Sequence, residues 1–415
     1  MGTNRRLLQV LAIIAASLTL VNCSGTPCVF GSNGAAEIRR PLLRAPKAAA
    51  TDVCPTNNGG GGGGGGGNGC SNTLTPTDVL FGQASTGAIT TLAINTGGNN
   101  LLLMCTTASA GLGQIVVANP FASGNNFLYA MSLSNSLPKT ATISGFAIGH
   151  VAPITLTSVG ADFTLSGAGV SLTSTVELQA DPFGRFLILT DTAANAFHVL
   201  NIDSTTGALS EALGSPVSVA NPLFTAVDET GDFLYVSDNA DGQIYIFDIG
   251  LGAQIVSSPF IVSNPQANSP ISMQVSGNFL YTANNQSISF YTINGDGSLT
   301  TVANSPFTPA PTFNPQLLAL DQTGRFLYAT GTGTEGVLGF VINANGSLTI
   351  IPGGPFAAGQ SVTDIVPNPL SGQMYLLNAG VIEVFTVDQN SGALTQVSGA
   401  SQFASSSNLA TASVQ

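Results

Sequence analysis

One short phrase recurs through most of this chain at a nearly constant spacing. The phrase "TGRFLY" around residue 326 returns as "TGDFLY" and "SGNFLY", with successive copies 46 to 48 residues apart except for one step of 59. A repeat of this length predicts one supersecondary unit per copy and a fold made by stacking the copies. The first aromatic residue of the phrase, or its equivalent, lies at Val79, Phe127, Phe186, Phe233, Phe279, Phe326 and Gln373.

Each copy has the pattern of four short β-strands. Within residues 316–351 the runs "QLLALD", "FLYAT", "VLGFVIN" and "SLTII" are separated by turns rich in Gly, Asn and Asp. Such runs are typical of an antiparallel meander, and turns such as "NGDGS" and "NANGS" supply residues that tolerate positive φ in tight hairpins. A four-stranded unit repeated every 40–50 residues indicates the blade of a β-propeller.

The two ends of the repeat region predict how the ring closes. The first copy begins at its second strand, near Asp78, whereas the last residues, "SNLATASVQ" (407–415), resemble an inner strand. We therefore expect an all-β, seven-bladed propeller of four-stranded antiparallel blades, in which the C-terminal strand completes blade one. The step of 59 residues predicts an insertion in blade two, between 133 and 171. The expected inner strands are 114–118, 175–180, 223–228, 270–275, 316–321, 362–366 and 408–414.

The N-terminus has the features of an export signal. Arg5 and Arg6 precede a 15-residue apolar stretch, 7–21, which is shorter than the roughly 20 residues of a membrane-spanning helix. Cys23 follows "LTLVN" and resembles the lipidated cysteine of bacterial lipoproteins, although Asn22 departs from the small residue preferred there. We expect lipidation at Cys23. Ordinary signal cleavage remains the alternative, and the Arg pair matches a twin-arginine signal poorly.

The next segment is expected to be a tether. Nine consecutive glycines, 59–67, cannot bury enough apolar surface to offset their ordering entropy. Cys54 and Cys70 could form a disulfide around this run, while the apolar strand pattern at Cys105 indicates a buried thiol. No cysteine or histidine spacing fits a metal site. The expected domains are a lipoprotein-type signal peptide at 1–23, a disordered Gly-rich tether at 24–76 and the propeller at 77–415.

Charge excludes one class of partner. From residue 71 onward three cationic side chains, Lys139, Arg185 and Arg325, accompany 19 carboxylates, a net charge of −16. Binding to nucleic acid needs clustered Lys and Arg. We therefore expect no nucleic-acid partner, and membrane attachment only through the N-terminal anchor.

The motifs "FLYVSDN", "FLYTANN" and the recurring "SPF" resemble those of the lactonase-type, YVTN-repeat seven-bladed propellers. That family includes 6-phosphogluconolactonase-like proteins and a muconate-lactonising cyclase, and the resemblance covers about residues 78–415. It implies that the "FLY" side chains pack between sheets and that "SPF" shapes the crossover to the next inner strand. It also raises lactone hydrolysis as an activity, although a shared scaffold does not establish one.

Ligands of propellers usually contact the face formed by the crossover loops and the loops between the second and third strands. Asn and Asp there also have an ordinary role, because their side chains bond the backbone of turns. Glu177 and Asp364 begin inner strands, where carboxylates facing a wet channel could act as acid and base or hold a divalent cation. The other candidates are Asp191, Asn195, Asp238, Asn239, Asp241, Asn284, Asn285, Gln286, Glu335 and, near an inner strand, Gln316.

The remaining chemistry-bearing residues are expected to be structural. His198 lies in a third strand and His150 in the blade-two insertion, and no nucleophile elbow or P-loop is present. Arg185 and Arg325 precede marker phenylalanines in a turn on the opposite face, where we expect solvated side chains. A phosphorylated lactone would need cations at its phosphate, so we expect any lactone substrate to lack phosphate.

The leading hypothesis is an exported, lipid-anchored propeller that acts as a binding or interaction scaffold on a bacterial envelope. Its ligand would be a protein or a carbohydrate, and we expect a monomer without cofactor or metal. The alternative hypothesis is a lactone hydrolase that uses carboxylates at the channel mouth.

Overall fold

The computed structural model describes residues 22–23, 26–27, 78–84, 88–94, 101–108, 114–119, 124–133, 140–150, 154, 156–165, 177–238, 241–249, 256–263, 270–309, 313–333, 335–357, 360–398 and 406–413. The chain divides into two units, and the repeats belong to the one comprising Lys47–Cys54 and Cys70–Gln415. In the other unit β1 (Asn22–Cys23) pairs with β2 (Thr26–Pro27). The rest of the expected signal peptide and tether, and the expected disulfide between Cys54 and Cys70, lie outside the described residues, and lipidation of Cys23 stays a prediction.

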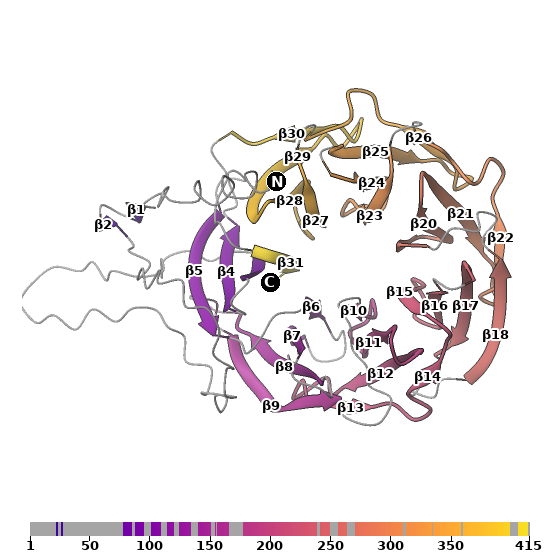
Figure 1. Ribbon diagram of the computed structural model, residues 1–415. Coiled ribbons are helices and arrows are strands. Elements are labelled where there is room, and N and C mark those ends of the chain that lie inside the picture. The colour runs from indigo at the N-terminus through magenta and orange to yellow at the C-terminus, as the bar shows by residue number, and fades with distance from the viewer. Residues whose placement is uncertain are drawn as a thin grey trace, which may run out of the picture. The chain divides into compact units, whose positions relative to one another are not determined.

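The unit that contains the repeats forms a ring of seven antiparallel sheets, as predicted. Its inner strands surround a central channel (Figure 1). Blade 1 contains β31 (Ser406–Ser413), β3 (Asp78–Ala84), β4 (Ala88–Ile94) and β5 (Leu101–Ala108). Blade 2 contains β6 (Ile115–Ala118), β7 (Phe127–Leu133), β8 (Ala141–Ile148) and β9 (Leu156–Leu165). Blade 3 contains β10 (Leu178–Ala180), β11 (Phe186–Asp191), β12 (Ala196–Ile202), β13 (Leu209–Glu211) and β14 (Val217–Ser218).

The other four blades follow the same order from the inner strand outward. Blade 4 contains β15 (Pro222–Val227), β16 (Phe233–Asp238), β17 (Gln243–Asp248) and β18 (Val256–Ser263). Blade 5 contains β19 (Ser272–Ser276), β20 (Phe279–Asn284), β21 (Ser287–Ile293) and β22 (Leu299–Thr301). Blade 6 contains β23 (Pro315–Leu320), β24 (Phe326–Gly331), β25 (Val337–Ile342) and β26 (Leu348–Ile350), and blade 7 contains β27 (Val362–Pro367), β28 (Gln373–Asn378), β29 (Val381–Val387) and β30 (Leu394–Gln396).

The ring closes through the C-terminal strand. β31 pairs antiparallel with β3, from Asp78 opposite Ser413 to Ala84 opposite Ser406. The predicted closure is therefore confirmed, and Figure 1 shows β31 at the inner end of blade 1. Without this pairing blade 1 would keep an unpaired inner edge, which sheets normally avoid.

The recurring Ser-Pro motif lies elsewhere than predicted. We expected it to shape the crossover to the next inner strand, but it lies within the outer strand. In blade 3 Pro216 falls between β13 and β14, and both of these segments pair with β12. In blade 5 Phe307 after Pro306 likewise pairs back to Ile288 of the third strand. Proline cannot donate a ladder hydrogen bond, which agrees with the division of the outer strand in blades 3 and 5. In blade 4, however, Pro259 lies inside the continuous strand β18.

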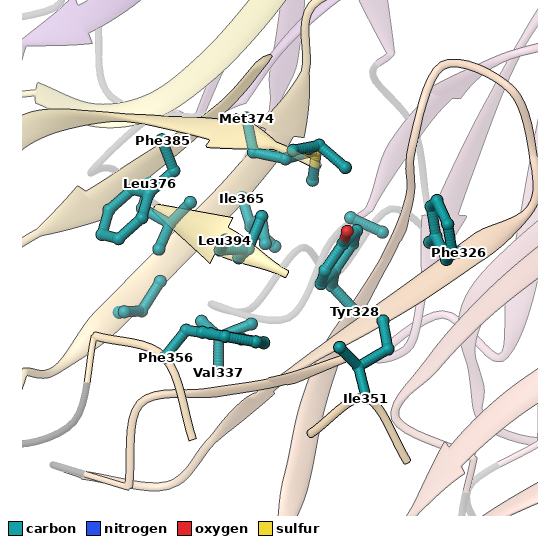
Figure 2. Packing of buried hydrophobic residues seen from close by; sticks show 13 residues of the cluster. Phe326, Tyr328, Val337, Ile351, Phe356, Ile365, Met374, Leu376, Phe385 and Leu394 are labelled. Carbon is teal, nitrogen blue, oxygen red and sulfur yellow. The ribbon is translucent and has the colours of Figure 1, made fainter. Parts of the chain in front are cut away.

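Apolar side chains of neighbouring blades form the core between them. In Figure 2, Phe326, Tyr328 and Val337 of blade 6 belong to the same apolar cluster as Met374 and Phe385 of blade 7. These five side chains are at most 3% exposed. The expected packing of the "FLY" residues between sheets is thus confirmed.

The "FLY" tyrosine also forms a hydrogen bond to the next blade. Tyr281 donates its hydroxyl to the carbonyl of Gly346 at 3.0 Å, and Phe279 packs on the same glycine. Gly346 has φ of +82°, so the turn and the close approach of the ring both require glycine. The same tyrosine–glycine bond joins Tyr129 to Gly207, Tyr235 to Gly297 and Tyr328 to Gly392.

A buried aspartate closes the turn between the first and second strands. Asp321 is 4% exposed and accepts hydrogen bonds from the backbone of Thr323 and Phe326, and Asp228 does the same from Thr230 and Phe233. With Asp181, which accepts the N–H of Phe186, this arrangement fixes the start of the second strand in blades 3, 4 and 6, a role that the sequence analysis did not assign.

The two arginines beside these turns also contact neighbouring blades. Arg185 pairs with Asp181 at 2.8 Å and donates to the carbonyl of Gly231 at 2.5 Å. Arg325 is exposed, as expected, yet it donates to the carbonyl of Gln389 in blade 7 at 3.1 Å. The expectation of simply solvated side chains was therefore incomplete, because both arginines link adjacent blades.

Candidate functional site in the central channel

A cavity of about 310 Å³ lies in the central channel. All seven inner strands contribute to its wall, together with the residues that directly precede β6 and β10. One position recurs around this wall, and its seven side chains, from blade 2 through blade 1, are Gln114, Glu177, Phe224, Ser272, Leu317, Asp364 and Asn408.

Side chains at this position bridge neighbouring blades. Each of four side-chain oxygens accepts a hydrogen bond from a backbone N–H of the next inner strand, at 2.6 to 3.0 Å. The donor follows the recurring position by one residue in every case. The pairs are Gln114 with Leu178, Glu177 with Thr225, Ser272 with Leu318 and Asp364 with Leu409. We name these four side chains the channel ring.

Glu177 lies at the start of β10 and is half-buried. Its Oε2 accepts hydrogen bonds from the backbone N–H and the hydroxyl of Thr225, at 2.6 and 3.2 Å. Desolvation in the narrow channel raises its pKa from 4.5 to about 8, against the opposing effect of the bonds from Thr225. At pH 7 the neutral carboxylic acid is therefore the main form.

Asp364 lies on β27 across the same cavity. One of its oxygens accepts a hydrogen bond from Leu409, and the other from its own neighbour Ile365, both at 2.8 Å. Desolvation raises the pKa of Asp364 from 3.8 to about 6, while these two bonds lower it. At pH 7 the ionised form is therefore the main one.

The two predicted catalytic candidates thus line one cavity, on inner strands of blades 3 and 7. No described contact joins the two carboxyl groups directly. Their catalytic role stays a prediction.

Three of the predicted ligand-binding residues are completely buried. Asp191, Asp238 and Asn284 each end the second strand of a blade, and each is 0% exposed. Asp191 accepts a hydrogen bond from the N–H of Ala194 in its own turn, and Asn284 donates to the hydroxyl of Ser289. The bonds of Asp191 and Asn284 are local, the ordinary role considered above, and ligand binding by any of the three stays a prediction.

The remaining loop candidates are dispersed. Asp241 is exposed and accepts hydrogen bonds from the N–H of Gln243 and the hydroxyl of Tyr245, whereas Asn239 lies outside the described residues. Glu335 accepts hydrogen bonds from the backbone of Asn314 and Thr332. Asn195 and Gln286 have positive φ, as turn residues often do, and Asn285 occupies the turn beside Gln286.

Gln316 does not line the cavity. It precedes Leu317, and its amide donates to the carbonyl of Pro315 at 3.1 Å. The register shift between Pro315 and Leu318 sets which of these residues reaches the channel. A bulge of this kind changes the face to which a side chain points, and it is not visible in the strand pattern.

The histidines lie away from the cavity. His198 is 5% exposed, and its Nδ1 lies 2.8 Å from Glu211, which also accepts a hydrogen bond from Ser215. Ser215 in turn accepts the backbone N–H of Val199, as Ser305 accepts that of Phe290 in blade 5. This repetition indicates a structural group. His150 is exposed at the end of β8.

The charge of the cavity limits its ligands. Among the described residues that line it there is no Lys, Arg or His. No group of three or more His, Cys, Asp or Glu among the described residues could hold a metal ion. Nothing in the described wall offers a phosphate the charge-assisted bonds that it prefers.

Among the residues that the structure describes, no helix is long and apolar enough to cross a membrane.

Several wall residues were missed in the sequence analysis. Gln114, Gln179, Phe224, Ser272 and Asn408 line the cavity. An alignment of the seven inner-strand segments would have placed four of them at one repeat position, and Gln179 two residues beyond it.

Comparison of the whole structure with known structures reveals the same architecture. A candidate 6-phosphogluconolactonase from Bacteroides fragilis aligns with a TM-score of 0.66 and 19% identity over 82% of this chain and 100% of that one. A periplasmic gluconolactonase from Pseudomonas aeruginosa aligns with a TM-score of 0.62 and 14% identity, over 81% and 99% of the two chains.

The fold is that of the lactonase-type propellers. A candidate 6-phosphogluconolactonase from Bacteroides uniformis gives a similar result, with a TM-score of 0.63 and 18% identity over 80% of this chain and 98% of that one. No protein-family model and no curated protein matches the sequence. The predicted resemblance to lactonase-type propellers is therefore confirmed at the level of fold, and identities this low carry no activity over to this chain.

Proposed function

We propose that this lactonase-type propeller is an exported binding module that holds a small, phosphate-free polar molecule in its central channel. The observation that carries the proposal is the cavity of about 310 Å³, to which every inner strand contributes. This volume lies at the lower end of the range typical of ligand pockets. Amide, hydroxyl and carboxyl groups line it, beside apolar Phe224 and Met273.

Binding without turnover agrees with the state of the two carboxyl groups. Glu177 and Asp364 both accept backbone hydrogen bonds from the next blade. Each group thereby has at least one oxygen committed to a backbone N–H, which fixes its position and leaves fewer acceptor sites for a reacting water.

The proposed location at a bacterial envelope rests on the N-terminal sequence. Arg5, Arg6 and the apolar stretch 7–21 have the order of a secretory signal, and Cys23 is placed for lipidation. One protein of the same fold is described as periplasmic. Metabolic labelling with a palmitate analogue should mark the wild-type chain but not Cys23→Ser, and labelling of both or neither would contradict the anchor.

Lactone hydrolysis is the second candidate, and one observation favours it. Glu177 and Asp364 line one cavity with pKa values of about 8 and about 6, on either side of neutrality. Such a pair can divide the roles of acid and base. Asp364 would take a proton from a water molecule while the oxygen of that water forms a bond to the lactone carbonyl carbon. Glu177 would protonate the ring oxygen as the acyl–oxygen bond breaks, giving the hydroxy acid.

The test uses the full chain and a panel of neutral sugars, polyols, lactones and sugar phosphates, with binding followed by calorimetry. Gln274→Trp should obstruct the channel, since Gln274 lines it, whereas Gln322→Trp changes an exposed turn and serves as the matched control. A ligand that loses at least tenfold in affinity only with Gln274→Trp supports the proposal. Equal binding by both variants, or no binding across the panel, would overturn it.

The same panel distinguishes the two candidate functions. Turnover of a lactone that is lost in Asp364→Asn would establish the hydrolase. Binding without turnover would establish the binding module.

A further inference from the structure

The channel wall of blades 2 and 3 has its hydrogen-bond acceptors occupied by the neighbouring blade. Gln114 Oε1 accepts the N–H of Leu178 at 2.6 Å, and Glu177 Oε2 accepts the N–H of Thr225 at the same distance. The hydroxyl of Thr225 donates to Gln179 Oε1 at 2.7 Å. All three acceptor side chains line the cavity.

This arrangement decides what the two glutamines offer to a ligand. A glutamine side chain has one acceptor oxygen and an NH₂ group with two donors. Because the oxygens of Gln114 and Gln179 are held by the next blade, the NH₂ groups are the ends left for the channel. Within the part of the chain that the structure describes, neither NH₂ group bonds another protein group.

Glu177 offers a donor as well. Its Oε2 accepts the N–H of Thr225 at 2.6 Å, while the single hydroxyl proton of Thr225 is directed to the nearer Gln179 Oε1. Oε1 of Glu177 bonds no described residue, and we place the proton of the neutral acid there. Burial raises the pKa of Glu177 to about 8, and the neutral acid therefore predominates at pH 7. β6 and β11 pack against β10, and Thr225 of β15 bonds Glu177. The described contacts of the carboxyl group are with uncharged Thr225 alone. The other titratable group among the described wall residues is Asp364, on β27.

We propose that Gln114, Glu177 and Gln179 form a wall of hydrogen-bond donors that selects ligands carrying a carbonyl-type oxygen. This inference rests on the proposed binding function and names the chemistry of its ligand. A carbonyl oxygen only accepts hydrogen bonds and so matches these donors fully. A hydroxyl group also brings a proton of its own, for which the three side chains leave no acceptor, and an unpaired polar group costs affinity.

Gluconamide and glucitol provide a matched pair of neutral probes. They differ at one carbon, which carries a carbonyl oxygen and an amino group in gluconamide and a hydroxyl group in glucitol. We expect the full chain to bind gluconamide at least tenfold more tightly at pH 6. Between pH 6 and pH 9 the affinity for gluconamide should fall about tenfold, because a group with a pKa of about 8 keeps roughly a tenth of its protons at pH 9.

Two substitutions at residue 177 separate the donor from the side chain's bulk. Glu177→Gln keeps a donor at every pH, and the same position in blade 2 is already a glutamine, Gln114, that accepts the next blade's N–H. This variant should bind gluconamide equally at pH 6 and pH 9. Glu177→Met removes the donor and should bind weakly at both. Circular dichroism of each variant checks that the propeller is folded.

Three outcomes would overturn the inference. They are equal binding of gluconamide and glucitol, no binding of either probe, and an unchanged pH dependence in Glu177→Gln. Gln179→Glu, which replaces the donor by an acceptor, gives an independent check and should weaken gluconamide binding at least tenfold. If other panel compounds bind in a manner sensitive to Gln274→Trp, the binding function stands even when the donor wall fails.

Discussion

Neighbouring blades are joined in two chemically different ways. Away from the channel, Phe279 packs on Gly346 of the next blade, and Tyr281 donates to the carbonyl of that glycine. At the channel, the oxygen of a polar side chain such as Glu177 accepts a backbone N–H of the next inner strand. The first contact combines the packing of an aromatic ring on glycine with one buried hydrogen bond and depends on shape, whereas the second is a polar contact that borders the cavity.

The difference indicates how one repeat can serve stability and ligand recognition together. The tyrosine–glycine contacts stabilise the packing of neighbouring blades, and they repeat with little change. The channel position varies from Gln to Glu, Phe, Ser, Leu, Asp and Asn around the ring. Variation there alters the surface that faces a ligand and leaves the apolar core between the blades intact.

The largest effect is expected at the tyrosine–glycine contact. In Gly346→Ala the new Cβ would overlap the ring of Phe279, at a residue with φ of +82°. Overpacking and left-handed strain together should lower the free energy of unfolding by about 2–4 kcal/mol. Gly277→Ala is the matched control, because its φ is +55° and its Cβ would meet nothing within 4 Å, so only about 1 kcal/mol should be lost. Equal losses in urea unfolding would show that the ring contact is unimportant.

The next largest effect is expected in the pH dependence of stability, through Glu177 and Asp364 of the channel ring. The pKa values of Glu177 and Asp364 are raised from 4.5 and 3.8 to about 8 and about 6. Their contribution to stability is therefore complete below about pH 4 and is lost as pH rises through 6 and 8. Unscreened shifts of this size would amount to about 5 kcal/mol between pH 5 and pH 9. Because both side chains are only half-buried and solvent screens them, the free energy of unfolding should fall by about 1–2 kcal/mol over this range. The double variant Glu177→Gln, Asp364→Asn should show a flatter profile.

Other carboxyl groups act in a different pH window. Hydrogen bonds from turn residues lower the pKa values of Asp203, Asp296 and Asp388 below 3.8. Their stabilisation is lost only as pH falls below about 4. A steep profile between pH 5 and pH 9 that persists in the double variant would therefore contradict the role given to the channel ring.

A smaller effect is expected from the tyrosine hydroxyl alone. Tyr281→Phe removes the hydrogen bond to Gly346 and should cost about 1 kcal/mol. Tyr245→Phe removes a bond to exposed Asp241 and should cost about half as much or less. Thermal unfolding of the two variants measures the difference, and a reversed order would show that the buried bond contributes nothing net.

The smallest effect is expected at the loop face. Asp241→Ala should change the free energy of unfolding by no more than about 0.5 kcal/mol, because its side chain is exposed. It should also leave the affinity of a channel ligand unchanged, as measured by calorimetry. A large loss of affinity would indicate that the ligand binds at the loops rather than in the channel, as the sequence analysis proposed for Asp241.

Much of the fold followed from the repeat. The spacing of the "FLY" phrase predicted seven blades, and the resemblance of 407–415 to an inner strand predicted the pairing of β31 with β3. These predictions succeeded because alternating apolar residues must be covered, and only neighbouring blades can cover them. The location of the Ser-Pro motif was wrong because the pairing of an interrupted outer strand is not encoded in its local pattern.

Only part of the candidate site could be predicted from the sequence. Glu177 and Asp364 were selected because carboxylates at the start of inner strands should face the channel, and both line the cavity. Asp191, Asp238 and Asn284 were selected by residue type, yet they are buried beneath turns. Residue type cannot separate a turn-stabilising Asp from a ligand-binding one, since both need the same oxygens.

The sequence by itself determined the number of blades, their strand order and the manner of closure, because periodic apolar patterns and turn residues act locally and repeat. Only the tertiary structure decided which ends of Gln114, Glu177 and Gln179 remain for a ligand. That choice depends on backbone N–H groups and a hydroxyl of the neighbouring blade, which lie 46 to 64 residues away in the chain and 2.6 to 2.7 Å away in space.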